Sequence, residues 1–272
     1  WAVSNKKRLD VAMTEQGLAE SRQKAQAVIM AGQVYVDGQK VDKAGAPVGE
    51  SARIEVRGKT MPYVSRGGLK LEKAMACWPI CLEGAVCADI GASTGGFTDC
   101  MLQNGAAKVF AVDVVYNQLD WRLRTHPKVV CMERTNARYL TVEQIPQPLD
   151  FFSVDVSFIS LNLILPALRP LMAPGGEGVC LVKPQFEAGK DKVGKKGVVR
   201  DPEVHLEVLS QFLIHAENAD FTVKDITFSP IKGPEGNIEY LGHLRAGAGV
   251  PYGGDLWELV QRSHNVWKEG RE

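Results

Sequence analysis

A glycine-rich turn at residues 91–96 lies between an apolar run and a helix-like stretch, and this order limits the folds open to the chain. The apolar run covers 85–90 and carries Asp89 near its end. A second apolar run at 108–113 follows the helix-like stretch and ends in Asp113. This order is typical of an open parallel sheet, in which ligands bind where a strand's carboxyl end faces a helix N-terminus. The sequence therefore predicts a strand–helix–strand unit that binds a nucleotide-like ligand.

The spacing of this turn, Asp-x-Gly-x-x-x-Gly-Gly, differs from the Gly-x-Gly-x-x-Gly pattern that holds a pyrophosphate in NAD enzymes. Asp89 would repel a diphosphate but suit a cationic ligand, and Asp113 can accept hydrogen bonds from a ribose diol. Gly95 and Gly96 would let backbone and ligand approach closely. These features resemble motif I and the next acidic position of S-adenosylmethionine (SAM) methyltransferases. The resemblance implies that SAM contacts Asp89, Gly91, Ala92, Ser93, Thr94, Gly95, Gly96, Phe97, Asp113 and, after the third strand, Asn136.

Charge is unevenly spread along the 272 residues, a length that fits two domains. The formal net charge is zero, so total charge does not indicate a polyanionic partner. Residues 183–200, however, contain six Lys/Arg and two Asp/Glu, and residues 1–60 contain ten Lys/Arg and seven Asp/Glu. Local basic surface of this kind suits RNA, and a solvated charged loop is an equally good explanation of the charges alone.

The six cysteines mostly lie within apolar runs and form no Cys-x-x-Cys pair. Cys77 and Cys81 have no second ligand pair nearby in sequence, so we expect no metal site. Reduced thiols, together with the absence of a visible secretory signal, predict a cytoplasmic protein. No apolar run reaches the ~20 residues that cross a bilayer, so we expect no stable membrane association.

Residues 1–60 form a small candidate domain of mixed α and β structure. Two short helices are predicted, one opening at Arg8 and one capped by Ser21, followed by a hairpin around Asp37-Gly38 and a strand at 52–56. The segments Arg8-Leu9-Asp10, Gly17-Leu18, Ser21-Arg22 and Gly32-Gln33-Val34-Tyr35-Val36 resemble the S4 RNA-binding domain. The resemblance implies that the basic residues Arg8, Arg22 and Lys24 contact RNA.

A linker is predicted at 61–66, and 67–272 form the second domain. A helix is expected from Gly67 towards Trp78, and apolar runs alternate with helical stretches after it, which predicts a doubly wound α/β sheet. The last two strands have no helix between them, so we expect an antiparallel hairpin. The strands are expected at 85–90, 108–113, 129–132, 151–156, 178–183, 221–228 and 238–244, and helices at 162–171, 203–219 and 255–268.

Four ionisable residues stand at separated places in this domain: Lys70, Asp155, Lys183 and Glu239. Asp155 and Lys183 end successive strands, so a parallel sheet brings them to the edge that carries the glycine-rich turn. Neighbouring lysines should lower each other's pKa, which would let one of them take a proton from a hydroxyl group. No Pro-Pro-Tyr motif and no cysteine beside a proline follow these strands, which disfavours methylation of a base.

The order Lys-Asp-Lys-Glu resembles the catalytic tetrad of FtsJ-like ribose 2′-O-methyltransferases. The sequence segments around these four residues are similar to those of the TlyA family, whose members join an S4 domain to an FtsJ-like domain. They are Arg66-Gly67-Gly68-Leu69-Lys70, Asp155-Val156-Ser157-Phe158, Leu181-Val182-Lys183-Pro184-Gln185-Phe186-Glu187 and Gly236-Asn237-Ile238-Glu239-Tyr240. The resemblance implies a Rossmann-like SAM methyltransferase sheet with an N-terminal α+β S4-like domain. The implied reaction is SAM-dependent methylation of cytidine 2′-oxygens in ribosomal RNA, 16S and/or 23S.

The implied partner is ribosomal RNA or a ribosomal subunit, and the oligomeric state stays open. Further RNA contacts are expected from Arg66, Lys192, Lys195 and Lys196. Val115 and Asn117 stand where the family usually has glycines, so the loop after Asp113 is expected to differ. The alternatives are a membrane-active protein, since the family is also named haemolysin, and a non-catalytic RNA-binding protein. A nicotinamide oxidoreductase is disfavoured by the glycine spacing.

Overall fold

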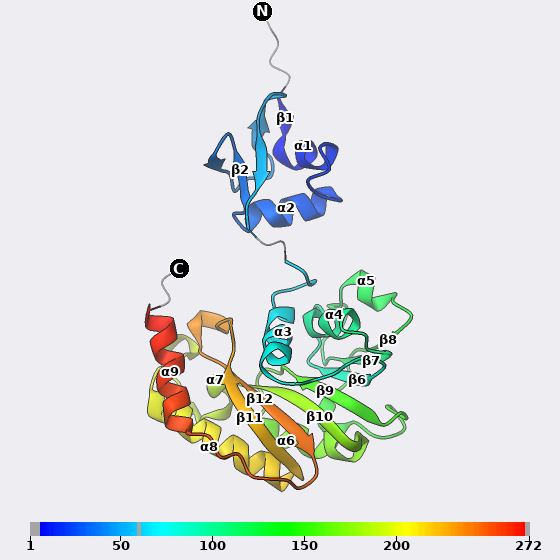
Figure 1. Cartoon of the computed structure of the whole chain (residues 1–272), viewed down its shortest axis with the longest axis vertical. Helices are drawn as coiled ribbons and strands as arrows, with labels where there is room; N and C mark the ends of the chain where they lie inside the picture. Colours follow the sequence, from blue (N-terminus) through cyan, green and yellow to red (C-terminus); the bar gives the residue numbers. More distant parts are fainter. Residues whose placement is uncertain (1–5, 59–60, 270–272) are drawn as a thin grey trace, which may run out of the picture. The chain divides into compact units, whose positions relative to one another are not determined.

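The computed structural model describes residues 6–58 and 61–269 (Figure 1). Residues 1–5 and 59–60 of the expected N-terminal domain, 1–60, therefore lie outside the described residues. Residues 270–272 lie outside them as well. Contacts within the chain define two compact units, Trp1–Pro62 and Tyr63–Glu272. By these contacts, Tyr63 to Arg66 lie in the second unit although they were expected in the linker. Each unit is described by itself.

The N-terminal unit packs two helices on a small antiparallel sheet of order β3-β2-β5, beside a second pair, β1-β4. The Ser21 hydroxyl caps the second helix by accepting a hydrogen bond from the Lys24 backbone N–H at 3.2 Å. Leu9, Met13 and Ile29 are fully buried in its core. The elements are β1 Lys7–Arg8, α1 Leu9–Glu15, α2 Arg22–Met30, β2 Val34–Val36, β3 Gln39–Lys40, β4 Pro47–Val48 and β5 Ile54–Val56.

The C-terminal unit alternates strands and helices along the chain, as expected. Its strands are β6 Val86–Ile90, β7 Lys108–Val112, β8 Val129–Met132, β9 Leu149–Val154, β10 Met172–Val182, β11 Phe221–Phe228 and β12 Tyr240–Ala246. Its α-helices are α3 Gly68–Cys77, α4 Gly96–Gln103, α5 Trp121–Arg124, α6 Leu161–Leu168, α7 Pro184–Glu187, α8 Pro202–Asn218 and α9 Leu256–Glu269. Short 3-10 turns are η1 Ala137–Tyr139, η2 Arg169–Leu171, η3 Lys190–Lys192, η4 Lys195–Gly197 and η5 Pro234–Gly236.

The seven strands form one sheet in the order β11-β12-β10-β9-β6-β7-β8. Strands β8, β7, β6, β9 and β10 run parallel, whereas β12 is antiparallel to both β10 and β11. The predicted α/β class and the antiparallel hairpin at the end of the sheet are therefore confirmed. Because β12 runs backwards, its first residue, Tyr240, pairs with Val182 at the end of β10. The start of β12 thus lies at the carboxyl edge of the parallel strands.

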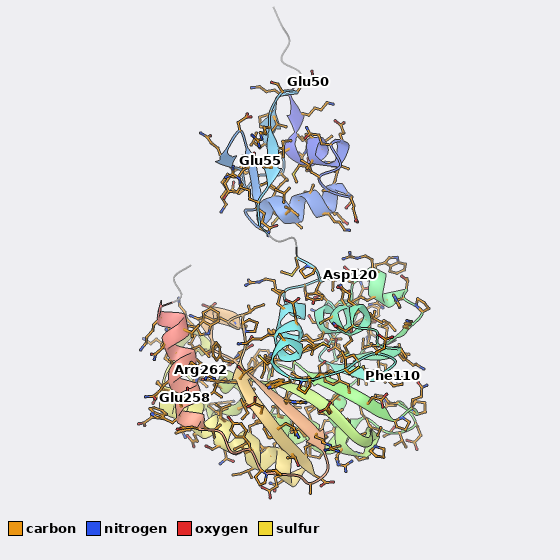
Figure 2. All side chains as sticks on the ribbon, in the orientation of Figure 1. Glu50, Glu55, Phe110, Asp120, Glu258 and Arg262 are labelled. Atoms are coloured by element: carbon orange, nitrogen blue, oxygen red, sulfur yellow. The ribbon has the colours of Figure 1, made fainter. Side chains whose placement is uncertain are left out.

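Helices cover both faces of the sheet. Buried residues of α6, α8 and α9 share one apolar core with the sheet, and those of α3 and α4 share another. Figure 1 shows α8 in yellow and α9 in red side by side. Figure 2 labels Glu258 and Arg262 on α9, which form an exposed ion pair at 3.3 Å, whereas Ser263 of the same helix is fully buried. The helix therefore presents one polar face and one packed face.

Candidate active site

The carboxyl edge of the sheet brings together residues from three adjacent strands. Asp155 follows β9 and Lys183 follows β10, and these strands are parallel neighbours. On the other side of β9, the Asp155 backbone N–H donates to the Ile90 carbonyl of β6 at 2.9 Å. The glycine-rich turn that follows β6 therefore lies directly beside Asp155.

Lys70, Asp155, Lys183 and Glu239, here called the tetrad, form one ion-paired group. Lys183 Nζ lies 2.5 Å from Asp155 Oδ1. Lys70 Nζ, from helix α3, lies 3.4 Å from Asp155 Oδ2 and 3.4 Å from Glu239 Oε1. Glu239 precedes β12 and is only 1% exposed. The structure thus brings together all four residues that the sequence analysis selected.

The charges of the tetrad reinforce one another in spite of burial. Burial opposes ionisation of Asp155, but Lys183 and Lys70 together hold the pKa of this carboxyl below its usual range. Burial likewise opposes charge on Lys70, yet Asp155 and Glu239 raise the pKa of Lys70 above its usual value. The pKa of Lys70 was expected to be lowered and is instead raised, because its two carboxylate partners outweigh the effect of burial.

Gln185 was not selected from the sequence, yet it contacts the tetrad. Its Nε2 donates to Glu239 Oε2 at 2.8 Å, so both oxygens of Glu239 have partners. A carboxylate only accepts, so this contact also fixes which end of the Gln185 amide faces Glu239. Gln185 lines a cavity of about 850 Å³ together with Phe158, Phe186, Lys196, Pro234 and Asn237. A cavity that can hold a substrate therefore adjoins the tetrad.

Asp113 and the turn after β6 form the candidate cofactor site. Asp113 Oδ2 accepts from the Ser93 backbone N–H at 2.7 Å, and Oδ1 accepts from the Val115 N–H at 3.0 Å. The half-buried carboxylate lines a small cavity with Ala92, Ser93, Gln118 and Glu133. Each of its oxygens keeps acceptor capacity, so it fits the ribose diol of a nucleoside. Thr94 is exposed on the same turn.

Four other residues of the predicted cofactor set face the protein interior. Asp89 is buried and accepts hydrogen bonds from the Thr98 backbone N–H, the Thr98 hydroxyl and the Ser153 hydroxyl. Phe97 packs in the core between α3 and α4. A Cβ at Gly95 would lie 2.3 Å from Leu123, and one at Gly96 would lie 2.4 Å from the Ser65 hydroxyl. These positions shape the turn through contacts with the chain itself.

Burial should make Asp89 a source of pH-dependent stability. Burial raises the pKa of Asp89 to about 7, although the hydrogen bonds from Thr98 and Ser153 act to lower it. The unfolded carboxyl loses its proton near pH 4 and the folded one near pH 7, so between these values the unfolded state binds fewer protons. The contribution of Asp89 to the free energy of unfolding is therefore fully present below about pH 4. It falls as the pH rises to about 7 and stays constant above that.

Urea unfolding of the wild type and of Asp89→Asn at several pH values tests this prediction. The free energy of unfolding of the wild type, relative to that of Asp89→Asn, should fall by a few kcal/mol between pH 4 and 7. Glu143→Gln, which neutralises an exposed carboxyl, should run parallel to the wild type. Parallel curves for the wild type and Asp89→Asn would count against a buried proton on Asp89.

The loops beside Asp113 are held by polar contacts that the sequence did not reveal. Asn136 is exposed, and its Oδ1 accepts from the Arg138 backbone N–H, which caps η1. Its expected contact with the adenine edge stays a prediction. Asn117, where the family usually has glycine, adopts a left-handed φ of 62° and donates its backbone N–H to Glu133 at 3.0 Å. Asparagine tolerates this conformation, so the loop keeps its turn without the glycine.

The basic residues predicted to contact RNA differ in how free they are. Arg8 donates two hydrogen bonds to the buried Asp10, at 3.0 and 2.9 Å, and Arg22 lies 3.4 Å from the same carboxylate. Lys24 pairs with Glu20 on the helix surface. All three basic side chains remain about half exposed. Arg8 therefore also has a structural role, since its guanidinium hydrogen bonds hold the pKa of Asp10 well below the usual range.

The second set of basic residues lies in the C-terminal unit. Arg66, Lys195 and Lys196 are exposed, and Lys192 pairs with Glu207 of α8 at 2.6 Å. Residues 189–200, here called the basic segment, are folded into two short turns, η3 and η4, and Val198 and Val199 anchor them in the interior. The segment is thus a packed element whose lysines point outward. Phe158, 90% exposed with a φ of 63°, packs its ring on Phe186 near this segment and was not selected from the sequence.

Comparison with known families agrees with this geometry. Residues 63–246, more than half of the chain, match the family described as FtsJ-like methyltransferase. The chain belongs to the FtsJ-like methyltransferase family. Residues 7–54 match the S4 domain, so the predicted fusion of the two domains is confirmed. No helix among residues 6–58 and 61–269 of this FtsJ-like protein is long and apolar enough to cross a membrane.

Relatives cover nearly the whole FtsJ-like chain. A candidate rRNA methyltransferase, YqxC, from Bacillus subtilis is 49% identical over 98% of this chain and 97% of that protein. The 16S/23S rRNA (cytidine-2′-O)-methyltransferase TlyA of Mycobacterium tuberculosis is 42% identical over 89% and 91%. A solved structure of a candidate hemolysin from Streptococcus thermophilus is 45% identical, with a TM-score of 0.77 and 98% of both chains covered. The predicted resemblance to the TlyA family is confirmed.

Proposed function

We propose that the chain transfers a methyl group from SAM to the ribose 2′-oxygen of cytidines in ribosomal RNA, in 16S RNA, 23S RNA or both. The observation that carries the proposal is the tetrad, which is ion-paired at the sheet edge beside the turn after β6. The name of the 42% identical TlyA relative supports the choice of RNA, base and oxygen. Action on ribosomal RNA would place the protein in the cytoplasm.

SAM would be held by Asp113 through its ribose hydroxyls and by the backbone of residues 91–94. When bound there, SAM supplies a methyl group activated on a sulfonium. The protein must then align the 2′-oxygen and remove its proton, since positioning and proton transfer are what lower the barrier. The tetrad supplies ionisable groups at this edge, and burial strengthens their interactions.

The two lysines of the tetrad have different surroundings and hence different proposed roles. Lys70 has two carboxylate partners, Asp155 and Glu239, so it stays a cation and holds the substrate by charge. Among the described residues, Lys183 has one carboxylate partner, Asp155, which fixes the direction of its amino group. We assign to Lys183 the proton that the 2′-hydroxyl loses when its oxygen gains the methyl group.

RNA would contact both units of the chain. The S4 domain supplies Arg22 and Lys24 together with Arg8, and the C-terminal unit supplies Arg66 and the basic segment, whose cations suit phosphates. Phe158 has an exposed aromatic ring at the cavity that adjoins the tetrad, and aromatic rings stack on unpaired bases. The ribosome or one of its subunits is the proposed partner.

The test is methylation of ribosomal subunits purified from cells that lack this protein. Addition of the purified chain and SAM should add methyl groups to cytidines, and each modified position should resist alkaline cleavage, because that reaction needs a free 2′-hydroxyl. A matched reaction without SAM should add none. Methyl groups on a base, or no transfer to either subunit, would refute the proposal. The membrane-active alternative stays a prediction, and leakage of lipid vesicles is its test.

A further inference from the structure

The peptide groups flanking Val199, at the end of the basic segment, are held on both sides by buried side chains. The Val199 N–H donates to Asn237 Oδ1 at 3.1 Å. Its carbonyl accepts from His205 Nε2 at 2.8 Å, since a carbonyl oxygen cannot donate. Val199, His205 and Asn237 are each at most 3% exposed. Water therefore cannot replace these hydrogen bonds, and losing either leaves a buried polar group without a partner.

The amide of Asn237 joins two segments that are far apart in the sequence. Its Nδ2 donates to the Gly197 carbonyl at 3.0 Å and to the Pro234 carbonyl at 2.9 Å. Two carbonyls on one side and an N–H on the other leave a single workable orientation of the amide. One side chain thus ties the basic segment to η5, and both of these segments line the cavity beside the tetrad.

The same residue organises the loop that covers Glu239. The Asn237 backbone accepts from the Gly233 N–H at 2.8 Å and donates to the Pro234 carbonyl at 3.2 Å, which closes the loop 233–237. A Cβ at Gly233 would lie 2.2 Å from Glu239 Oε2, so this loop packs tightly on the carboxylate. Asn237 precedes Glu239 by only two residues. The position of the loop and that of Glu239 are therefore set together.

His205 connects this arrangement to the C-terminal helix. Because His205 Nε2 donates to Val199, its Nδ1 accepts from the Tyr240 hydroxyl at 2.9 Å, and Tyr240 also contacts the Ser263 hydroxyl of α9 at 2.9 Å. Burial lowers the pKa of His205 to about 4, so the ring is neutral at neutral pH and the pattern holds. Tyr240 follows Glu239 directly in the sequence. The basic segment is thus fastened to residues on both sides of Glu239.

We propose that Asn237 is a positioning residue for methyl transfer, which fixes the basic segment and η5 against each other and sets both relative to Glu239. The inference rests on the proposed function. RNA that binds the basic segment would then contact a surface whose position relative to the tetrad is fixed, so binding also aligns the ribose with the tetrad. A displacement of about 1 Å in such a surface lowers rates by as much as about 100-fold.

The test compares Asn237→Ala, Asn237→Asp and the wild type in steady-state methylation of ribosomal subunits, with SAM affinity measured by calorimetry. Asn237→Ala should lower kcat and raise KM for the subunit, each by about tenfold or more, with SAM affinity within about twofold of the wild type. Asn237→Asp keeps the acceptor for Val199 but sets a carboxylate oxygen against the Gly197 and Pro234 carbonyls, so its loss should be at least as large as that of Asn237→Ala. Asn218→Ala, at the exposed end of α8, is the control and should behave as the wild type.

Each outcome decides between the two proposals. An inactive wild type overturns the proposed function and the positioning role with it. An active wild type with unchanged kcat and KM in Asn237→Ala overturns the positioning role alone. A loss in Asn237→Ala that is accompanied by lost SAM affinity also overturns it, because Asn237 would then only maintain the fold. If Asn237→Ala does not fold, Asn237→Ser, which keeps a small hydroxyl that can donate or accept, decides by the same criteria.

Discussion

Replacing Lys183 by alanine should abolish methyl transfer while SAM binding persists. Lys183 is buried at the end of β10, and Asp155 Oδ1 lies 2.5 Å from its amino group. In the proposed mechanism this change removes the group that takes the proton of the 2′-hydroxyl, and proton transfer by a positioned side chain contributes about 10²–10⁴-fold to such rates. Single-turnover transfer to ribosomal subunits should therefore fall by about that factor. Calorimetry should give SAM affinity close to that of the wild type, because Asp113 and the turn after β6 are untouched.

Lys183→Arg separates charge from proton transfer. A guanidinium keeps the positive charge near Asp155 but does not give up its proton, so this variant should fail as well. Lys128→Ala, at the opposite edge of the sheet, is the matched control and should be fully active. Near-normal turnover by Lys183→Arg would show that charge and position suffice.

Gly91→Ala should damage both stability and catalysis, because Gly91 touches the tetrad backbone. Its φ is +80°, and a Cβ there would lie 2.1 Å from the Asp155 carbonyl oxygen and 2.8 Å from its carbonyl carbon. These are backbone atoms, so the turn after β6 or the strand end at Asp155 must move. We expect a loss of about 2–4 kcal/mol in the free energy of unfolding from strain and crowding together. The rate of methyl transfer should fall at least tenfold through displacement of Asp155.

Gly84→Ala is a control that isolates the steric part of this effect. Gly84 has a similar φ of +69°, but a Cβ there would meet nothing within 4 Å. This variant should lose only about 1 kcal/mol from the left-handed conformation and keep full activity. Urea unfolding and single-turnover kinetics of both variants provide the comparison. Equal stability and equal activity of the two variants would contradict a steric link between the turn and Asp155.

The sequence predicted those parts of the site that depend on strand order. Asp155 and Lys183 each follow an apolar strand, and parallel neighbours end at one edge, so their contact followed from the alternation of strands and helices. The selection of Lys70 and Glu239 needed the family resemblance. No local pattern in the sequence around Lys70, at the start of α3, indicates burial beside two carboxylates, since that burial comes from packing of α3 against the sheet.

Side-chain partners were the part that the sequence could not supply. Gln185 and Asn237 are ordinary polar residues in the chain, and only the fold shows that one holds Glu239 and the other joins two loops. Asp89 was expected to face a ligand because it ends a strand. The structure turns its carboxylate towards Thr98 and Ser153 inside the sheet layer. Alternation along β6 does not decide this, because both faces of a parallel sheet are covered.

Element boundaries deviated where proline or glycine was involved. The helix expected at 162–171 ends at Leu168 and continues as the 3-10 turn η2, because Pro170 has no N–H to continue the α-helical pattern. Strand β10 begins at Met172 instead of near 178. Pro174, Gly175 and Gly176 indicate a turn by composition, but the structure places them in an irregular strand start, with a register shift against β9 before Glu177.

Because β12 is antiparallel, its first residues lie at the tetrad, so the tetrad is completed late in synthesis of the chain. Glu239 stands at the start of β12, which is the last strand of the sheet to leave the ribosome and is inserted between β10 and β11. A nascent chain that stops before residue 239 carries Lys70, Asp155 and Lys183 but lacks the second carboxylate beside Lys70. The tetrad is thus completed only in the final part of translation, and prematurely terminated chains would be released without it.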